Sequence, residues 1–245
     1  MEEDPFEKWI SGMFAPKTEH RETFFDRFAE RLVSIASLQP SAMILDVATG
    51  QGSILKQVAK VVGPNGTLIG IDIDSSVLEK TFKNLKKYSQ IQLYCMDAHA
   101  LDFNDNWFDI VFCGFGVYTF DDPDRAVKEM FRVLKPEGKV YISIWAVELL
   151  EKSSQKFVAS LLSKAGFIEV EVIHDKIDFV YPTFNDWYDS PTLQMGKAEL
   201  ETLKPQEISS VKKTIKEIYG PYIKSDGLHQ PLNVQYFHAS KPPHQ

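Results

Sequence analysis

Short apolar segments and amphipathic helices alternate along most of this chain, and this alternation restricts the fold more than any other feature. Apolar, strand-like runs occupy 43–47, 67–71, 91–95, 108–113 and 139–145. Helical periodicity occupies 24–35, a segment beginning at Ser53, 75–88, 121–134 and 153–165. Strands that alternate with helices form a parallel sheet with helices on both faces. The sequence therefore predicts an α/β fold.

Two longer alternating segments, 168–181 and 232–240, are predicted to pair like a hairpin at the end of this sheet. The region 183–222 between them is predicted to be a mostly helical excursion. We expect one domain over 1–245, which has four parts: an N-terminal helical cap at 1–40, a core at 41–182, the excursion at 183–222, and a final strand and tail at 223–245.

Composition disfavours several classes of protein. With 245 residues and 44% hydrophobic content the chain can bury a sizeable core, and its net charge of −7 disfavours nucleic acid as a partner. The start, MEEDPFEKWI, lacks the apolar segment of a signal peptide, and no run approaches the ~18 apolar residues of a membrane span. Cys95 and Cys113 fall in predicted strands and are expected to be buried free thiols. We expect a cytoplasmic monomer or homodimer that binds no metal.

The stretch ILDVATGQGS at 44–53 places a carboxylate and two glycines where the first strand ends. Ligands of open α/β sheets bind at the carboxyl ends of the strands. Asp46 precedes Gly50 and Gly52, and no third glycine opens the helix, so the pattern differs from a pyrophosphate-binding loop. A carboxylate there favours a cation, and we infer a ligand with an ammonium group and an adenosine. A tight strand-to-helix turn without a ligand is the alternative.

Further acids follow the second and third strands. Asp72 ends the second strand, where an acid can accept both ribose hydroxyls, although Asp72 or, more suitably, Asp74 can instead cap the next helix. Asp97 follows the third strand and can accept from an adenine amino group, or be an ordinary turn aspartate. The fourth strand ends in CGFG at 113–116. Acids after three successive strands at one sheet edge indicate a nucleoside site.

At this point the sequence resembles the class I S-adenosylmethionine-dependent methyltransferases, in the small-molecule branch that includes ubiquinone and menaquinone C-methyltransferases. The matching pieces lie between about residues 43 and 171: ILDVATGQGS, LIGIDID, MDAHALDF, FDIVFCGFGVYTFDDPDRAVKEMFRVLKPEGKVYISIW and LLSKAGFIEVEV. Ala48 departs from a frequent glycine. The resemblance implies a Rossmann-like three-layer sandwich, with a seven-stranded, mostly parallel sheet whose last strand is antiparallel.

The resemblance also implies a role for each matching position of the cofactor-binding core. The main chain at Ala48, Thr49, Gly50 and Gly52 lines the methionine part of S-adenosylmethionine, and Asp46 holds its amino group. Asp72 binds the ribose, Ile73 packs on the adenine, and Asp97 and Ala98 read its edge. Gly114 and Phe115 pass beside the sulfonium. The implied product is S-adenosylhomocysteine.

The implied reaction is an in-line displacement of the methyl group by a small-molecule acceptor, which needs mainly alignment and exclusion of water. His20, His99, Tyr118 and Asp121 are candidates for a general base, but no motif assigns one of them as catalytic. Trp145 is expected in the acceptor pocket or in the core. Two alternatives remain, namely a protein of this fold without methyl transfer and a nicotinamide-dependent dehydrogenase.

The segment between Trp145 and Ser153 is too short for an extra helix pair above the acceptor. We therefore expect lid segments elsewhere that exclude water from the site. One is the N-terminal stretch, and the other lies in 183–222. Their apolar anchors are Phe6, Trp9, Ile10, Met13, Phe14, Phe184, Trp187, Tyr188 and Leu193. Satellite packing or an oligomer contact is the alternative for these residues.

Overall fold

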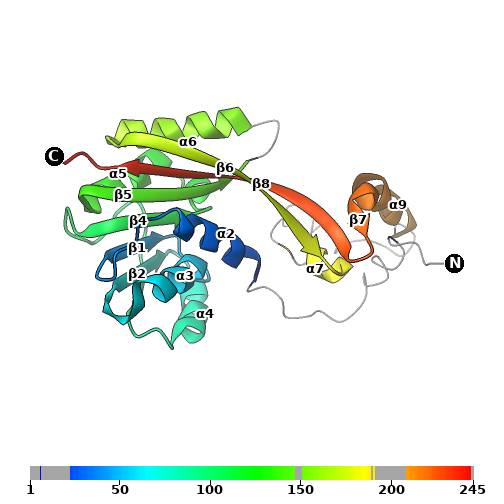
Figure 1. The fold of residues 1–245 in the computed structure, drawn as a ribbon, viewed down its shortest axis with the longest axis horizontal. Coiled ribbons are helices and arrows are strands. Elements are labelled where there is room, and N and C mark those ends of the chain that lie inside the picture. The colour runs from blue at the N-terminus through cyan, green and yellow to red at the C-terminus, as the bar shows by residue number, and fades with distance from the viewer. Residues whose placement is uncertain (1–5, 7–22, 147–150, 189, 191–207, 244–245) are drawn as a thin grey trace. The chain divides into compact units, whose positions relative to one another are not determined.

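A mixed β-sheet with helices on both faces forms the centre of the computed structural model, which describes residue 6 and residues 23–146, 151–188, 190 and 208–243. The strands are β1 (Met43–Val47), β2 (Thr67–Asp72), β3 (Ile91–Cys95), β4 (Phe108–Gly114), β5 (Leu134–Trp145), β6 (Ile168–Tyr181), β7 (Ile223–Lys224) and β8 (Gly227–Ser240). Their order in the sheet is β3-β2-β1-β4-β5-β8-β6, with β7 paired to β8 (Figure 1). This arrangement confirms the predicted fold class.

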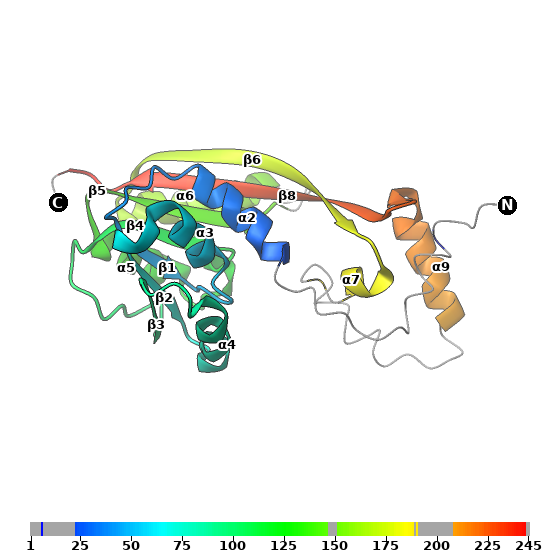
Figure 2. The ribbon, with the colours of Figure 1, turned by 60° about the horizontal axis from the view of Figure 1, so that its bottom comes forward.

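Parallel pairing joins β1 to β2, β2 to β3, β1 to β4 and β4 to β5, whereas β8 runs antiparallel to β5. The strand order reverses between β1 and β4, which makes the carboxyl ends of these strands the expected ligand edge. Figure 2 shows β6 and β8 side by side at the other end of the sheet.

Contacts divide the chain into two compact units. Unit 1 comprises Met1–Phe24 and Lys176–Leu232, and unit 2 comprises Phe25–Asp175 and Asn233–Gln245. The helices of the described residues are α2 (Thr23–Ser34), α3 (Ser53–Val62), α4 (Ser75–Leu85), α5 (Pro123–Val133), α6 (Glu151–Ala165), α7 (Phe184–Tyr188) and α9 (Ile208–Tyr219). None of them is long and apolar enough to cross a membrane.

The core of unit 2 follows from the alternation of side chains along the strands. One face of the sheet contributes buried residues such as Leu45, Val111 and Ile142 to a cluster with the apolar sides of α5 and α6. The helices α2 and α3 cover the opposite face (Figure 1), where Phe28 packs edge-on against Trp145 at a centroid distance of 5.0 Å. Apolar surface is buried on both faces of the sheet. Its burial stabilises this three-layer arrangement by about 25 cal/mol per Å².

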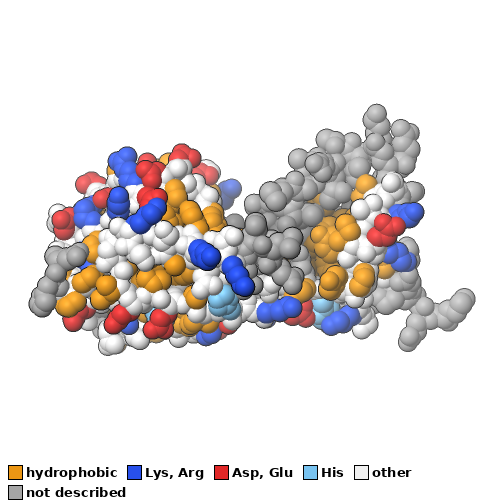
Figure 3. All heavy atoms as spheres, turned by 90° about the horizontal axis from the view of Figure 1, so that it is seen from above, with side chains coloured by type: hydrophobic (Ala, Val, Ile, Leu, Met, Phe, Trp, Pro, Cys, Tyr) orange, Lys and Arg blue, Asp and Glu red, His pale blue; other side chains and the backbone are white. Residues whose placement is uncertain are grey.

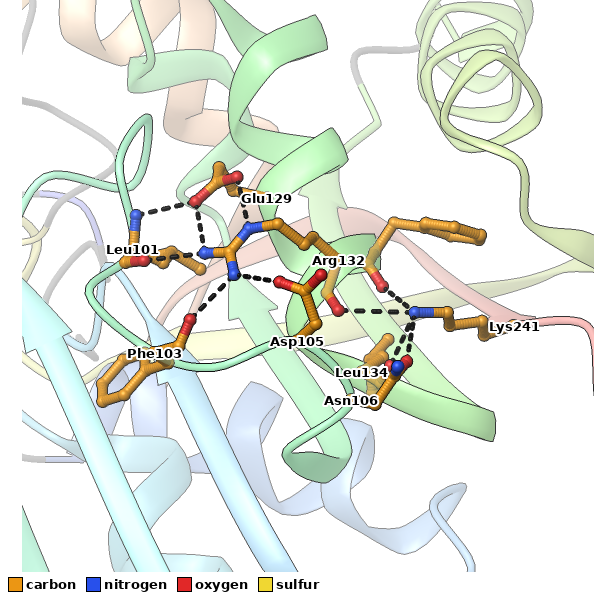
Figure 4. A network of polar contacts seen from close by, with 9 residues as sticks. Leu101, Phe103, Asp105, Asn106, Glu129, Arg132, Leu134 and Lys241 are labelled. Carbon is orange, nitrogen blue, oxygen red and sulfur yellow. Dashed lines mark hydrogen bonds and ion pairs between the residues drawn. The ribbon is translucent and has the colours of Figure 1, made fainter. Parts of the chain in front are cut away.

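A polar network ties α5 to the loop after β3 (Figure 4). Arg132 donates all five of its N–H groups, two of them to the carboxylate of Glu129 at 2.8 Å each. The others reach Asp105 Oδ1, Phe103 O and Leu101 O at 2.7–2.8 Å. Because its geometry is bidentate and every donor is used, this arginine fixes the path of the loop.

A buried lysine holds the other side of the same helix end. Lys241 is 4% exposed, and its ammonium group donates to Asn106 Oδ1, Phe131 O and Leu134 O at 2.8–2.9 Å (Figure 4). A cation at the carboxyl end of a helix satisfies carbonyls that have no partner within the helix. Lys241 therefore attaches the chain after β8 to the end of α5.

Unit 1 contains its own apolar cluster. Phe184 and Trp187 are buried and pack against each other at 5.4 Å, and Trp187 contacts Tyr219 at 5.0 Å. Phe6 is 4% exposed and has the Lys216 ammonium 4.9 Å from its ring centre. These contacts are compatible with satellite packing and do not test the lid, which stays a prediction; Trp9, Ile10, Met13, Phe14 and Leu193 lie outside the described residues.

Several expectations about elements need correction. The final strand begins at Gly227 rather than 232, and the two-residue strand β7 precedes it through a tight turn at Ser225–Asp226. Strand β5 begins at Leu134 rather than at 139, so residues 135–138 lie within it beside a register shift. Cys113 is buried as expected, but Cys95 is exposed because β3 is an edge strand.

On the face that Figure 3 shows, acidic and basic side chains of the described residues are interspersed, and neither sign of charge forms a separate patch.

Candidate functional site

Asp46 is the most buried charged group at the carboxyl ends of the parallel strands. Asp46 lies on β1 with 1% of its surface exposed, and its Oδ2 accepts a hydrogen bond of 2.6 Å from Thr49 Oγ1. The other oxygen, Oδ1, is buried and receives no hydrogen bond from the described residues. A buried acceptor without a partner costs about 1–3 kcal/mol, so this oxygen marks a position where a donor is missing.

The electrostatics of Asp46 follow from this burial. Removal from water raises the pKa of the carboxyl to about 7, the Thr49 hydrogen bond opposes the shift, and the negative charge of Asp72 adds to it. A cation near Oδ1 favours the ionised form and thus reverses the shift.

The loop after β1 has an unusual backbone. Ala48 has φ +57°, a left-handed conformation that non-glycine residues rarely adopt, and Gly50 and Gly52 have φ +52° and +78°. A Cβ at Gly116, in the loop after β4, would lie 2.7 Å from the Cβ of Ala48. The β1 and β4 loops therefore touch, and only glycine fits at 116.

Asp72 connects the loop after β1 to the end of β2. Its Oδ2 accepts from the Gly50 N–H at 2.9 Å, and its Oδ1 accepts from the Asp74 N–H at 3.0 Å. Asp74, not Asp72, caps α4 by accepting from the Ser76 and Val77 N–H groups. The structure thus assigns the cap to Asp74, while the ribose role of Asp72 stays a prediction.

The helix α4 also supports the glycine loop. Thr81 is 0% exposed, and its hydroxyl donates to the Gly50 carbonyl at 2.7 Å. The sequence analysis missed this residue, because a threonine within a helical pattern carries no signal for a long-range contact. The loop is held from both sides, by Asp72 at its N–H and by Thr81 at its C=O.

An exposed apolar surface lies beside these polar groups. Ile73 is 74% exposed although it directly follows a buried strand. Cys95 lies opposite Asp72 in the register of β2 and β3, and its thiol contacts the Ile73 carbonyl at 3.5 Å. An apolar side chain beside a carboxylate suits a ligand with a flat ring and hydroxyl groups.

Asp97 lies in the turn after β3, and its carboxylate is oriented by the residue two positions later. Its Oδ1 accepts from both the backbone N–H and the ring Nδ1 of His99, at 2.9 and 2.6 Å. The backbone hydrogen bond from His99 is the main reason why the pKa of Asp97 is lowered. Ala98, between them, is buried.

Beyond Gly114, the end of β4 carries an aromatic cluster, which we define as Phe25, Phe28, Phe115 and Trp145. Phe115 has φ +60° and stacks on Trp145 with ring centres 4.1 Å apart. Phe25 and Phe28 of α2 contact the Phe115 ring at 5.8 and 5.5 Å. Trp145 is half-buried, so it belongs both to the packing of α2 and to the surface at the strand ends.

The candidate bases have different positions. Both ring nitrogens of His99 are engaged, since Nε2 accepts from the Asp122 N–H at 3.2 Å. Tyr118 is exposed and stacks on Phe157 of α6 at 5.5 Å, and Asp121 is exposed. His20 lies outside the described residues. The geometry does not select a general base among them.

The described residues fit a nucleoside that carries an ammonium group. Three features of the fit are independent: the Asp46 oxygen without a donor among the described residues, the exposed Ile73 directly after Asp72, and the open space beside Gly50, where a Cβ would meet no atom within 4 Å. An ammonium group would donate to the Asp46 oxygen, a flat ring would cover Ile73, and the ligand could approach the main chain closely at Gly50.

Comparison with known proteins gives one family. Residues 23–195 match the model of the ubiE/COQ5 methyltransferase family. A "Ubiquinone/menaquinone biosynthesis C-methyltransferase UbiE" from Burkholderia mallei is 32% identical over 180 residues, which cover 68% of this chain and 73% of the relative. A "Demethylmenaquinone methyltransferase" from Lactobacillus johnsonii is 42% identical over 101 residues, 40% of this chain and 41% of the relative. The chain thus aligns with less than half the length of the latter protein.

Solved structures share the fold at low identity. A phosphoethanolamine N-methyltransferase 2 from Haemonchus contortus, in complex with phosphomonomethylethanolamine and S-adenosylhomocysteine, has a TM-score of 0.56 and 19% identity, covering 88% of this chain and 52% of that chain. The [4+2]-cyclase SpnF has a TM-score of 0.58 and 18% identity, covering 97% and 92%. At these identities the similarity shows the fold alone.

Proposed function

Because the chain belongs to the ubiE/COQ5 methyltransferase family, we propose that it transfers a methyl group from S-adenosylmethionine to a small-molecule acceptor. The observation that carries this proposal is the buried Asp46 carboxylate, whose Oδ1 has no donor among the described residues at the edge where ligands of such sheets bind. When bound, S-adenosylmethionine supplies a methyl group already activated by a positive sulfur.

The chain's own residues bind and orient in this proposal. Asp46 accepts from the ammonium group of the methionine part, and the main chain from Ala48 to Gly52 lines that part. Asp72 accepts from the ribose hydroxyls with lone pairs that Gly50 and Asp74 leave free. Ile73 packs on the adenine, and Asp97 and Ala98 bind its edge.

The aromatic cluster supports the water exclusion that methyl transfer needs. Phe28 is fully buried, and Phe115 and Trp145 stack beside Gly114, where we place the sulfonium. In such an apolar site, the alignment of donor and acceptor is the main source of acceleration. For well-oriented reactants it lowers the activation barrier by on the order of 7–11 kcal/mol.

We propose the class of methyl acceptor from the names of the relatives. Quinol-like rings are the first acceptors to test, because the Burkholderia relative is named for ubiquinone and menaquinone biosynthesis. A second candidate is a reaction without methyl transfer, since the structurally similar SpnF is a [4+2]-cyclase.

The deciding experiment is methyl transfer from labelled S-adenosylmethionine to quinol-like, phenolic and amine acceptors. Label in an acceptor product supports methyl transfer, whereas cofactor binding without transfer to any acceptor favours the second candidate. Titration with NADH is the control for the dehydrogenase alternative and should show no binding.

Asp72→Ala tests the cofactor site itself. Loss of charge-assisted hydrogen bonds to the ribose should weaken S-adenosylmethionine binding about ten- to a hundredfold. Asp74→Ala is the matched control: it removes the α4 cap, so it should lower the free energy of unfolding by about 1 kcal/mol and leave the affinity nearly unchanged. Equal affinity of folded Asp72→Ala and wild type in calorimetry would remove the ribose role.

A further inference from the structure

His99 makes two hydrogen bonds through its ring that the proposed reaction does not require. Nε2 faces the backbone N–H of Asp122 at 3.2 Å, and Nδ1 lies 2.6 Å from Asp97 Oδ1. A backbone N–H can only donate, so Nε2 accepts and Nδ1 carries the proton. The ring is therefore a neutral donor to Asp97, and this assigns its tautomer.

These contacts fix the Asp97 carboxylate in one orientation. Oδ1 takes two hydrogen bonds, from the His99 N–H and from its ring, while none of the described residues donates to Oδ2. The turn is further closed by the Ala100 N–H, which donates to the Asp97 carbonyl at 3.1 Å. The Asp97 side chain is 50% exposed, so Oδ2 is accessible to a ligand.

The ring of His99 is itself held in place. Its side chain is 16% exposed, and the ring packs edge-on against Phe120 with centres 5.9 Å apart. Asp122, whose N–H binds Nε2, is the N-cap of α5 and accepts from the Arg125 N–H at 3.0 Å. The orientation of Asp97 thus depends on the start of α5, through His99.

We propose that His99 is a positioning residue that makes this site selective for a 6-aminopurine over a 6-oxopurine; the proposal rests on the proposed function. With Oδ1 occupied, the only acceptor that Asp97 presents is Oδ2. Adenine offers a 6-amino donor to it. Hypoxanthine presents a carbonyl oxygen at the same position, which repels the carboxylate and leaves both groups without a donor.

The experiment measures nucleobase preference rather than affinity alone. Calorimetry with the full chain compares S-adenosylhomocysteine with S-inosylhomocysteine, which differ at the 6-position of the purine and in the hydrogen that hypoxanthine carries on N1; the variants show how much of the preference depends on His99. Wild type should prefer the adenine ligand. His99→Phe keeps the ring packing on Phe120 but loses both hydrogen bonds, and it should reduce this preference about two- to tenfold.

His99→Asn is the matched control. Its amide nitrogen can take the place of Nδ1 and donate to Asp97, so this variant should retain most of the preference although the bond to Asp122 is lost. Melting curves establish that each variant is folded. If His99→Phe does not fold, His99→Leu, which also lacks the donor, is measured in its place, and a folded His99→Leu with the full wild-type preference overturns the positioning role.

The outcomes separate this inference from the proposed function. If His99→Phe weakens both ligands by the same factor, the histidine is only structural and the inference is wrong. If wild type binds S-adenosylhomocysteine without any preference over S-inosylhomocysteine, Asp97 does not read the 6-position and the inference is also wrong. If wild type binds neither ligand, the proposed function fails and the inference fails with it.

Discussion

At the scale of single residues, Asp46 shows how a group that we propose for binding lowers the stability of the protein that carries it. The same burial that orphans Oδ1 raises the pKa of the carboxyl to about 7, well above the value near 3.9 expected in an unfolded chain. A group whose pKa is raised by folding stabilises the fold below its unfolded pKa, and that stability is lost as the pH rises through the folded pKa. Without a bound cation, Asp46 therefore lowers the free energy of unfolding above neutral pH.

Asp46→Asn tests this directly. Between pH 5 and pH 8, the ionisation of Asp46 should lower the free energy of unfolding of the cofactor-free wild type by up to about 3 kcal/mol, relative to the variant. Asparagine fits the site without ionising and can still accept from Thr49. Urea unfolding at both pH values measures the difference, and parallel pH curves for the two proteins would contradict it.

Single residues also show which parts of the site the sequence does not predict. The positions of Asp46, Asp72 and Asp97 at one sheet edge could be predicted because each lies at or just after the carboxyl end of an apolar run, whereas their binding roles stay a prediction. The supports of the site are Thr81, which binds the Gly50 carbonyl, and the ring of His99, which binds Asp97. They come from a helix and a turn whose spacing to the site exists only after folding. The exposure of Cys95 was missed for the same reason, since an edge strand and a central strand have similar sequences.

At the scale of elements, α4 has a function beyond covering the sheet. Thr81 donates to the carbonyl of Gly50, while Asp72 accepts from the N–H of the same residue. Because both main-chain polar groups of Gly50 are hydrogen-bonded, the two peptide units that flank it keep the loop in the conformation that we propose for binding.

Thr81→Val is expected to loosen this loop. The isosteric change removes the hydroxyl and should weaken S-adenosylhomocysteine binding about two- to tenfold. Thr81→Ser retains the hydroxyl and is the matched control, which should bind nearly as wild type does. If calorimetry gives both variants the same affinity, the hydrogen bond to Gly50 does not position the loop.

The carboxyl end of α5 gives an opposite case, in which a polar group serves stability alone. Lys241→Met keeps the apolar stem but leaves Asn106 Oδ1 and the Phe131 and Leu134 carbonyls without their donor. We expect the free energy of unfolding to fall by about 2–4 kcal/mol in urea titrations. The affinity of the folded variant for S-adenosylhomocysteine should not change, because Lys241 follows an antiparallel strand and lies at the edge opposite the site; a weakened affinity would show that α5 transmits strain to it.

Elements were predictable where they are long and periodic. The apolar period separates β1 to β4 from the helices that follow, so their existence and order could be read from the sequence. The two-residue strand β7 carries no period of its own, and the Asp-Gly pair at 226–227 is its only local signal. Strand β5 was predicted too short because Pro136 and Gly138 indicate a turn, yet Phe108 pairs with Leu134 across the register shift.

At the scale of the whole molecule, the division into two units follows from the long strands β6 and β8, each of which contributes residues to both. Their alternating pattern predicts extended strands, but periodicity does not tell where contacts with one cluster end and contacts with another begin. The buried Phe184 and Trp187 mark the second cluster, which the sequence indicated only as aromatic residues without a partner in the sheet.

The last prediction concerns how the acceptor is shielded from water. Strand β5 ends at Trp145 and α6 begins at Glu151, so the connection at 146–150 is too short to hold a helix pair. We predict that the N-terminal stretch and the region 183–222 form the lid instead, and that the former closes only with cofactor. Hydrogen exchange of the full chain with and without S-adenosylmethionine should therefore show added protection at residues 5–25. The strand β1, protected in both states by its central place in the sheet, is the internal control. Equal protection of residues 5–25 in both states would exclude a lid that responds to cofactor, and added protection only around Asp46, Asp72 and Asp97 would mean that the site closes without this segment.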